Sequence, residues 1–479
     1  MHAERRPQIS LPVVAVSIIA GLSCLRLAHV PFLWSDEDYH LAAAIQMLHG
    51  RVPYRDFWYD KPPLPALYYL LIGGYSGWPL RLLDSAYILL ACRLAFQLAR
   101  SWWGETEAWI AALLLSFFTA FYLPSAVIPF AADALMLVPH LAALLCAQRR
   151  RPVWAGFWAG VAFLANPKAF FVLAVCIVWL WPGWMLPLLG FAALALAAFL
   201  CALFTGAGPG YVEQVWRWGL VYATGSPAAH PLLLGLSRTA DWIGFHAALA
   251  AGVCLAFPRM NIRDRWRAAA WLSLSFVAVC LGTRFVPRYF LQLLPGAVII
   301  GSKGLVESWR AHRKATGIVL ALLLLVPLVR FGPRYAALAY DDLADHPPSW
   351  SDLALNLDSR DAARAIRSRS QSGDTLFVWG YRPDIYVYTR MVPAGRFWDS
   401  QPLTGVPADR HLSASQPIYS GPAGANREEL IRTHPTFLVD GLSLLNPKLQ
   451  PGAYPELRPW LAGYRLVDRT RFCLIYRRQ

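Results

Sequence analysis

The stretch WSDEDYHLAAAIQMLHGRVPYRDFWYDKPPLPALYYL, residues 34 to 70, is a polar island in a very apolar chain. It follows the first hydrophobic segment, ends in a run containing a double proline, and carries the ionisable residues Asp36, Glu37, Asp38, Asp56, Asp60 and Lys61. Ionisable groups at a membrane face are costly and are usually retained for function. The stretch therefore predicts a functional site beside a membrane.

The composition indicates a polytopic membrane protein followed by a soluble domain. Of the 479 residues, 57% are hydrophobic, and apolar stretches of about 20 residues, enough to cross a bilayer, recur from residue 12 to residue 330. Beyond them the chain becomes polar and strand-like, so we expect domains at 1–334 and 335–479. The net charge of +15 comes from arginines at the ends of apolar segments, as in cytoplasmic loops, and does not indicate nucleic acid.

The arginine clusters predict the topology. With the basic N-terminus inside, an uncleaved first helix delivers the polar island to the outer face. The segment 153–181 is predicted as two short spans broken near Asn166–Pro167, because proline removes a backbone donor and clashes with the preceding turn. This break also places the basic loop 259–267 inside. The result is about eleven transmembrane helices in a bacterial inner membrane, with the C-terminal domain outside the cytoplasm.

This topology gathers polar residues from distant segments on the outer face. A site there has no access to ATP or nucleotide sugars, which favours a lipid-linked donor. The residues brought to that side are Asp36, Asp60, Lys61, Asp133, Lys168, Arg284 and Arg288.

The C-terminal part predicts a small α/β domain. Its pattern indicates an amphipathic helix with a polar start, two buried strands, a second helix and a closing hairpin. The expected ranges are 358–369, 375–379, 436–439, 455–461, and 464–467 paired with 472–476. Only Cys473 of the eight cysteines lies in this part, so an internal disulfide is excluded and no metal-type cysteine spacing is present.

Two motifs carry a resemblance to a known family. The pair Asp36-Glu37 directly after the first span, followed by Asp60-Lys61-Pro62-Pro63-Leu64, resembles the GT-C membrane glycosyltransferases. The similar branch contains the aminoarabinose transferases of lipid A and the protein O-mannosyltransferases, and the resemblance covers about residues 11–335. It implies transfer of a pentose or hexose from a polyprenyl-phosphate donor to an envelope lipid, glycan or protein on the outer face.

The acidic pair provides the candidate catalytic residues. Sugar transfer to a hydroxyl needs a base, for which a carboxylate is suitable, and in the family the first acid of this loop is the presumed base, which corresponds to Asp36. A phosphate leaving group needs no second acid of the kind found in hydrolases. Glu37 is predicted as a supporting or metal-facing group and Asp38 as a helix cap. The alternative for Asp36 is itself a cap of the following helix.

Asp60 and Lys61 are candidates for donor binding. A lysine at headgroup level can neutralise the carrier phosphate, and the preceding acid can orient the lysine or the sugar. The alternative is a lysine that snorkels to the interface.

Asp133 and Lys168 are further candidates for contact with the sugar or the phosphate. Asp133 opens a span, where a helix dipole alone would favour an acid. Lys168 lies in Asn-Pro-Lys, where the family often has Thr-Lys-Gly.

Arg284 and Arg288, in GTRFVPRYFLQLLPG, resemble the family's Arg-Tyr-Leu-Leu-Pro string. Guanidinium groups suit phosphate oxygens, although anchoring to anionic lipids would also explain them. The aromatic residues of the outer loop 205–241, including Trp218 and Tyr222, are predicted to form an interfacial belt. Tyr381 and Trp398 are predicted to pack within the soluble domain.

Two questions stay open at this level. No metal-binding constellation is predicted, yet a divalent cation between Asp36 and Asp133 is compatible with the sequence. The alternative function is a polytopic lipid or sugar transporter or flippase, although no related halves of the kind common in transporters are present. A catalytically silent envelope scaffold is a further rival.

Overall fold

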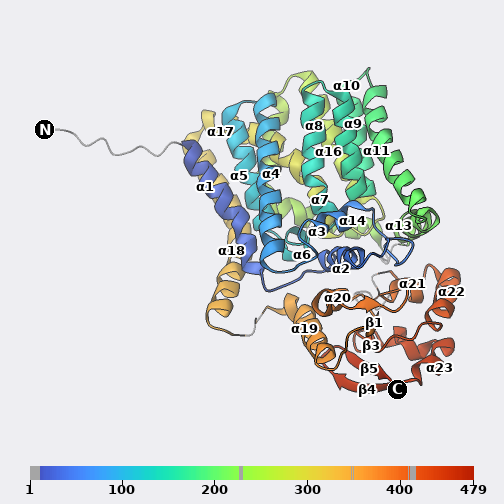
Figure 1. Cartoon of the computed structure of the whole chain (residues 1–479). Coiled ribbons are helices and arrows are strands. Elements are labelled where there is room, and N and C mark those ends of the chain that lie inside the picture. Colours follow the sequence, from blue (N-terminus) through green and yellow to red (C-terminus); the bar gives the residue numbers. More distant parts are fainter. Residues whose placement is uncertain (1–10, 226–229, 347, 349, 408, 410–416) are drawn as a thin grey trace.

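The computed structural model describes residues 11–479 except 226–229, 347, 349, 408 and 410–416. A bundle of long helices forms one layer, and a smaller α/β domain lies against one end of it (Figure 1). The helices of the bundle are α1 (Leu11–Cys24), α2 (Glu37–Leu48), α3 (Leu64–Leu70), α4 (Trp78–Trp102), α5 (Glu105–Ala120), α6 (Pro124–Val127), α7 (Ala132–Leu135), α8 (Leu137–Gln148), α9 (Pro152–Ala165), α10 (Phe170–Leu180), α11 (Met185–Phe204), α12 (Gly208–Tyr211), α13 (Trp218–Thr224), α14 (Pro231–Phe245), α15 (Ala247–Ala256), α16 (Ile262–Cys280), α17 (Leu294–Ala311) and α18 (Arg313–Leu343).

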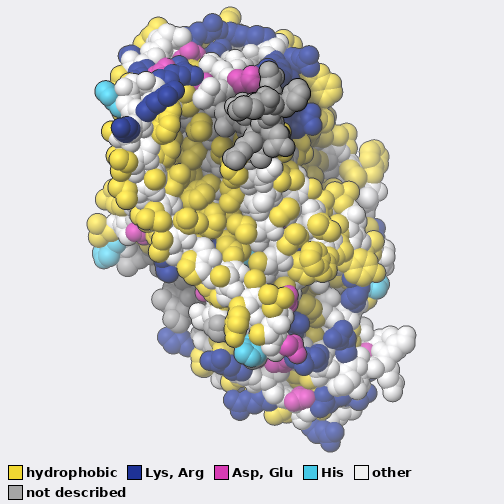
Figure 2. All heavy atoms as spheres, turned by 90° about the vertical axis from the view of Figure 1, so that its left-hand side faces the viewer, with side chains coloured by type: hydrophobic (Ala, Val, Ile, Leu, Met, Phe, Trp, Pro, Cys, Tyr) yellow, Lys and Arg dark blue, Asp and Glu magenta, His cyan; other side chains and the backbone are white. Residues whose placement is uncertain are grey.

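The bundle has the lengths and surface of an integral membrane protein. By length and composition, four helical segments of the described chain could cross a membrane, namely Pro12–His29, Trp78–Trp102, Met185–Phe204 and Arg313–Leu343. The bent pair Pro231–Phe245 and Ala247–Arg259, with an angle of 87°, would make a fifth, and shorter apolar helices lie between them. Figure 2 shows hydrophobic side chains over the side of the bundle and Lys and Arg gathered at its end. The predicted number of about eleven spans is not confirmed.

The predicted break in segment 153–181 is confirmed. Helix α9 ends at Ala165, a short turn η2 (Pro167–Ala169) follows, and α10 begins at Phe170. Asn166 has extended backbone and its side chain accepts a hydrogen bond from the Lys168 N–H, so the asparagine caps the turn that proline opens. The break carries Lys168 to the inside of the protein.

The C-terminal domain contains one mixed five-stranded sheet of order β2-β1-β3-β5-β4. Strand β1 pairs in parallel with β2 and β3, whereas β5 is antiparallel to both β3 and β4. Its elements are α19 (Ala354–Arg367), β1 (Thr375–Trp379), α20 (Asp384–Thr389), β2 (Val392–Pro393), α21 (Gln401–Thr404), α22 (Ser420–Leu430), β3 (Phe437–Asp440), α23 (Arg458–Leu461), β4 (Tyr464–Arg469) and β5 (Leu474–Arg478).

Every element predicted for this domain is present within a few residues. The central strands β1 and β3 are buried, as their apolar runs predict. The helix predicted at 358–369 begins earlier, at Ala354. The domain boundary predicted at 334/335 falls inside α18, which continues to Leu343.

The polar island forms the layer between the two domains. Helix α2 packs on α20 of the C-terminal domain (Figure 1). Trp58 joins the layers through its backbone, because its N–H donates to the Arg396 carbonyl at 2.7 Å and its carbonyl accepts from Trp398 Nε1 at 2.7 Å. The polar island is therefore held from both sides.

Candidate active site

Asp36 begins helix α2 with an unusual backbone conformation. Its φ is 79° and its ψ is −36°, a conformation that costs a non-glycine residue about 1–3 kcal/mol and that clusters at functional sites. Its carboxylate makes no cap hydrogen bond to the described first turn of α2. It instead forms an ion pair with Arg288 and accepts a hydrogen bond from the Tyr381 hydroxyl at 3.3 Å. The geometry therefore argues against the alternative role as a cap.

Asp38 organises this turn instead. Its Oδ1 accepts hydrogen bonds from the backbone N–H groups of Asp36 and Tyr39, both at 2.8 Å. Asp38 thus holds the backbone of Asp36 in place, which agrees with the structural role predicted for it.

Glu37 faces away from Asp36 and is sealed inside the bundle. Its carboxylate accepts from Arg81 Nη2 at 2.6 Å and from the Trp34 N–H at 2.7 Å. Arg81 also pairs with Asp84 at 3.0 Å, and the side chains of all three charged residues are fully buried. The oxygens of Glu37 are occupied by this buried framework, which argues against the predicted metal-facing role, and the predicted supporting role stays a prediction. Sequence reasoning missed Arg81 and Asp84, although their spacing of three residues in an apolar helix was a usable signal.

Asp60 and Lys61 form an ion pair of 2.8 Å at the edge of the site. Asp60 Oδ2 also accepts from Trp218 Nε1 at 3.1 Å, and Lys61 Nζ lies 6.0 Å from the ring centre of Tyr222. Trp218 is buried, so the belt position predicted for this tryptophan is wrong. The double proline stiffens the backbone between this pair and α3, which begins at Leu64.

Lys168 lies beneath the site on an aromatic ring. Its Nζ is 3.2 Å from the ring centre of Tyr289 and is buried with no hydrogen-bond partner among the described residues. Asp133 Oδ1 accepts from Asn166 Nδ2 at 2.8 Å and lies within electrostatic reach of Lys168 and Lys61. Lys168 therefore lies inside the cluster, and Asn166 links it to Asp133.

Two tyrosines connect these cations. The Arg284 guanidinium lies 3.8 Å from the ring centre of Tyr222 and donates to the Tyr222 carbonyl at 3.1 Å. Tyr222 and Tyr289 lie within electrostatic reach of each other, and Tyr289 directly follows Arg288. Five of the eight predicted residues thus lie around one pair of tyrosines, namely Lys61, Asp133, Lys168, Arg284 and Arg288. Asp60 and Asp36 join them through their ion pairs with Lys61 and Arg288, and Glu37 is the exception.

The C-terminal domain supplies residues that the sequence analysis assigned to packing. Tyr381 reaches Asp36, and Tyr39 stacks between Tyr59 and Tyr381 with ring centres 5.4 Å and 5.5 Å away. Trp398 contacts the polar island rather than only its own domain. No local pattern could have identified these two residues, because their role depends on how the domains dock.

Asp399 is a buried carboxyl group next to the same cluster. Burial raises the pKa of Asp399 to about 8, and the nearby carboxylates of Asp409 and Asp60 also raise it. The Gln401 N–H, which donates to Asp399 Oδ1 at 2.9 Å, acts in the opposite direction. Asp399 is therefore largely protonated at neutral pH and adds no full negative charge beside Asp60.

The divalent cation considered between Asp36 and Asp133 stays a prediction. Within the described part of the chain, no group of three or more His, Cys, Asp and Glu side chains converges on one point.

The comparisons with known proteins concern the fold. No family model matches the chain, and no curated protein matches its sequence. The fold is similar to that of an ArnT and of an archaeal oligosaccharyltransferase, which agrees with the resemblance that the loop motifs indicated.

The structure of ArnT from Cupriavidus metallidurans bound to undecaprenyl phosphate has a TM-score of 0.64 and 16% identity, with 97% of each chain covered. The apo form of the same protein has a TM-score of 0.61 and 15% identity, again with 97% of each chain covered. The apo oligosaccharyltransferase of Archaeoglobus fulgidus has a TM-score of 0.50 and 14% identity. The match covers 91% of this chain and 70% of the oligosaccharyltransferase chain. At these identities the likeness establishes the fold, and the chemistry must be argued from the site.

Proposed function

We propose that the chain is a membrane glycosyltransferase that moves a sugar from a polyprenyl-phosphate donor to an envelope lipid, glycan or protein. The observation that carries this proposal is a partly exposed carboxylate, Asp36, in a strained backbone conformation beside a cluster of four cations. The cations are Lys61, Lys168, Arg284 and Arg288. The ArnT structure of the same fold holds undecaprenyl phosphate, which supports a donor of this class.

The proposed reaction is one displacement at the anomeric carbon. The acceptor hydroxyl gives its proton to Asp36 while its oxygen bonds to that carbon. The bond from the anomeric carbon to the phosphate oxygen breaks, and the phosphate leaves with the electron pair. Lys61 and the arginines neutralise the charge that develops on the phosphate. One displacement inverts the anomeric configuration.

The ion pair between Asp36 and Arg288 couples donor binding to the base. Arg288 lies beside Tyr289, on which Lys168 rests, so the Asp36 partner is also part of the cation cluster. A donor phosphate that draws Arg288 toward itself weakens the hold on the Asp36 carboxylate. The base is thereby released for the acceptor proton when the donor is in place.

The site lies between the bundle and the C-terminal domain, so the proposal includes the topology. We propose about eleven spans in the bacterial inner membrane, with the C-terminal domain outside the cytoplasm. A reporter fused after Leu343 is expected on the outer face, and one fused after His312 inside. The reverse result would place the site where nucleotide sugars are available and would remove the argument for a lipid-linked donor.

The function is tested by mass spectrometry of envelope glycolipids and glycans from cells with and without the gene. We expect one sugar modification to disappear without the gene, and to stay absent when only Asp36→Asn is supplied. The rival transporter makes a different prediction, because Asp36→Asn would then leave the modification in place wherever the variant is folded. A complete set of modifications without the gene would contradict the proposal.

A further inference from the structure

A second polar feature lies at the other end of the bundle. Helix α4 begins beside the C-terminal domain, where Ser76 and Gly77 share a hollow with α19, so its last turns lie at the opposite end. These turns carry residues at positions i, i+3, i+4, i+7 and i+8, which form one helix face. They are Arg93, Phe96, Gln97, Arg100 and Ser101.

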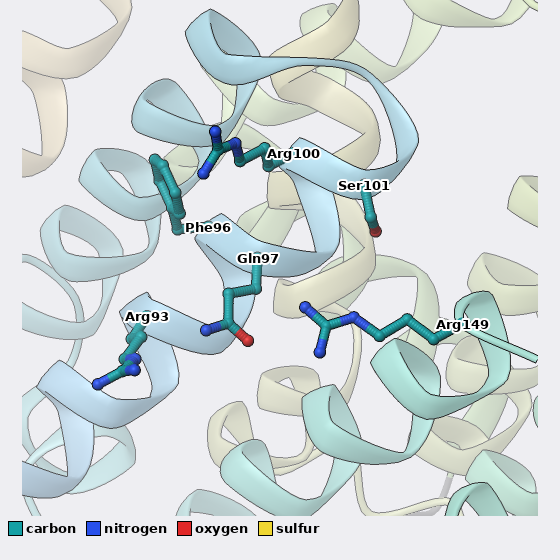
Figure 3. Close-up of a pocket in the computed structure, with 6 residues that line it drawn as sticks. All are labelled: Arg93, Phe96, Gln97, Arg100, Ser101 and Arg149. Carbon is teal, nitrogen blue, oxygen red and sulfur yellow. The ribbon is translucent and has the colours of Figure 1, made fainter. Parts of the chain in front are cut away.

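This face lines a hollow of about 490 Å³ that Arg149 completes. Arg149 is the residue directly after α8, which packs against α4. Figure 3 shows the Arg149 side chain extending from the end of α8 toward Gln97 on α4. The hollow therefore has walls from two helices that are distant in sequence.

The arginines of this hollow carry more charge than their neighbours neutralise. Arg100 has one loose ion pair, at 3.8 Å to Glu105. Arg93 and Arg149 are exposed, and neither forms an ion pair with any residue that the structure describes. An anion would balance this positive charge.

The depth of Arg93 distinguishes this hollow from an ordinary basic helix end. Arg93 precedes the end of α4 by nine residues, or about 14 Å at the usual helical rise. Arginines at cytoplasmic helix ends, such as Arg100 and Arg149, need no further reason. A cation inside a span is by default a functional feature.

We propose that this hollow binds the phosphate of an anionic phospholipid. Guanidinium groups present a fork of donors that matches phosphate oxygens. Leu89 and Leu90, one helical turn before Arg93, are exposed on the same side of α4, so acyl chains can lie along this helix below the headgroup. The leucines favour a lipid over a free phosphate. This site is independent of the chemistry at the other end.

The test uses the full chain purified in a non-ionic detergent. Native mass spectrometry counts bound lipids after equal amounts of phosphatidylglycerol and phosphatidylcholine are added. We expect a preference for phosphatidylglycerol that falls about fivefold for each arginine removed, from the attraction of one arginine to an anionic lipid. The variants are Arg149→Gln, which changes only a residue outside the helices, and Arg93→Gln/Arg149→Gln.

The control is Arg313→Gln, an exposed arginine at the start of α18 that does not line the hollow. It should keep the preference of the unmodified chain. An undiminished preference in Arg149→Gln and the double variant would overturn the site. Equal binding of water-soluble glycerol phosphate would overturn the lipid as the ligand, since the leucines would then contribute nothing.

Discussion

Asp36 and Glu37 are neighbours in sequence, and each pairs with an arginine, yet their surroundings are opposite. The Glu37–Arg81 pair is 0% exposed on both sides, and Arg81 also donates to the His29 and Phe32 carbonyls at 3.2 Å and 2.7 Å. In the Asp36–Arg288 pair, the Asp36 side chain is 33% exposed and that of Arg288 is 16% exposed. The comparison shows that a carboxylate paired with an arginine can form either a buried structural ion pair or a site whose partners can exchange. The burial of the pair and the number of hydrogen bonds it makes determine which of the two it forms.

The largest expected effect separates the two acids by activity. Asp36→Asn keeps the size of the side chain and a residue type that tolerates positive φ, but it cannot accept the proton. Loss of a general base costs about 10²–10⁴-fold, so we expect turnover with a polyprenyl-phosphate sugar to fall by that factor at normal folded yield. Near-normal turnover would move the role of base to Asp133.

Where a change at Asp36 is expected to reduce activity, a change at Glu37 is expected to reduce stability. Glu37→Gln removes one of the two carboxylates that balance Arg81 inside the bundle and leaves only Asp84, and breaking a buried pair costs about 3–5 kcal/mol. We expect a large fall in the thermal unfolding midpoint in detergent, with turnover per folded molecule close to normal. A stable but inactive Glu37→Gln variant would show that Glu37 belongs to the site and would end the contrast.

The next effect concerns the donor. Removing Lys61 or Arg288 takes away a charged hydrogen bond to the carrier phosphate, worth about 1.5–3 kcal/mol. Lys61→Ala and Arg288→Ala should therefore weaken binding of the polyprenyl-phosphate sugar about 10–100-fold, measured by titration of the purified chain. Lys448→Ala, in the C-terminal domain, should bind the donor normally. Unchanged affinity in both variants would reduce these residues to lipid anchors.

A further expected effect is the pH dependence set by Asp399. Its pKa is about 8 in the folded chain and near 3.9 when unfolded. The folded state therefore binds more protons between these values, and stability falls as pH rises from about 4 to about 8, by at most about 1.4 kcal/mol per pH unit. The Asp399→Asn variant should lack this contribution to the fall in stability. The measurement is the unfolding midpoint between about pH 4 and about pH 8. An identical pH profile in both proteins would show that Asp399 titrates normally.

The sequence predicted the parts of this molecule that depend on local pattern. Strand β1 lies at the predicted residues, and the proline after Asn166 breaks the helix as expected, because both follow from short-range backbone rules. The cations of the site were predicted by motif and by charge-based topology. The roles of Glu37, Tyr381 and Trp218 were missed because they depend on tertiary contacts. Glu37 points inward because it pairs with Arg81 on α4. Tyr381 contacts Asp36 because the C-terminal domain packs on α2.

The most direct test of the central claim is the anomeric configuration of the product. The purified chain is given a polyprenyl-phosphate sugar of known configuration and an envelope acceptor, and the new linkage is read by nuclear magnetic resonance. Our account predicts inversion, with release of polyprenyl phosphate, because Asp36 assists a single displacement. Retention of configuration would contradict it, since retention requires two displacements and a covalent intermediate on the protein.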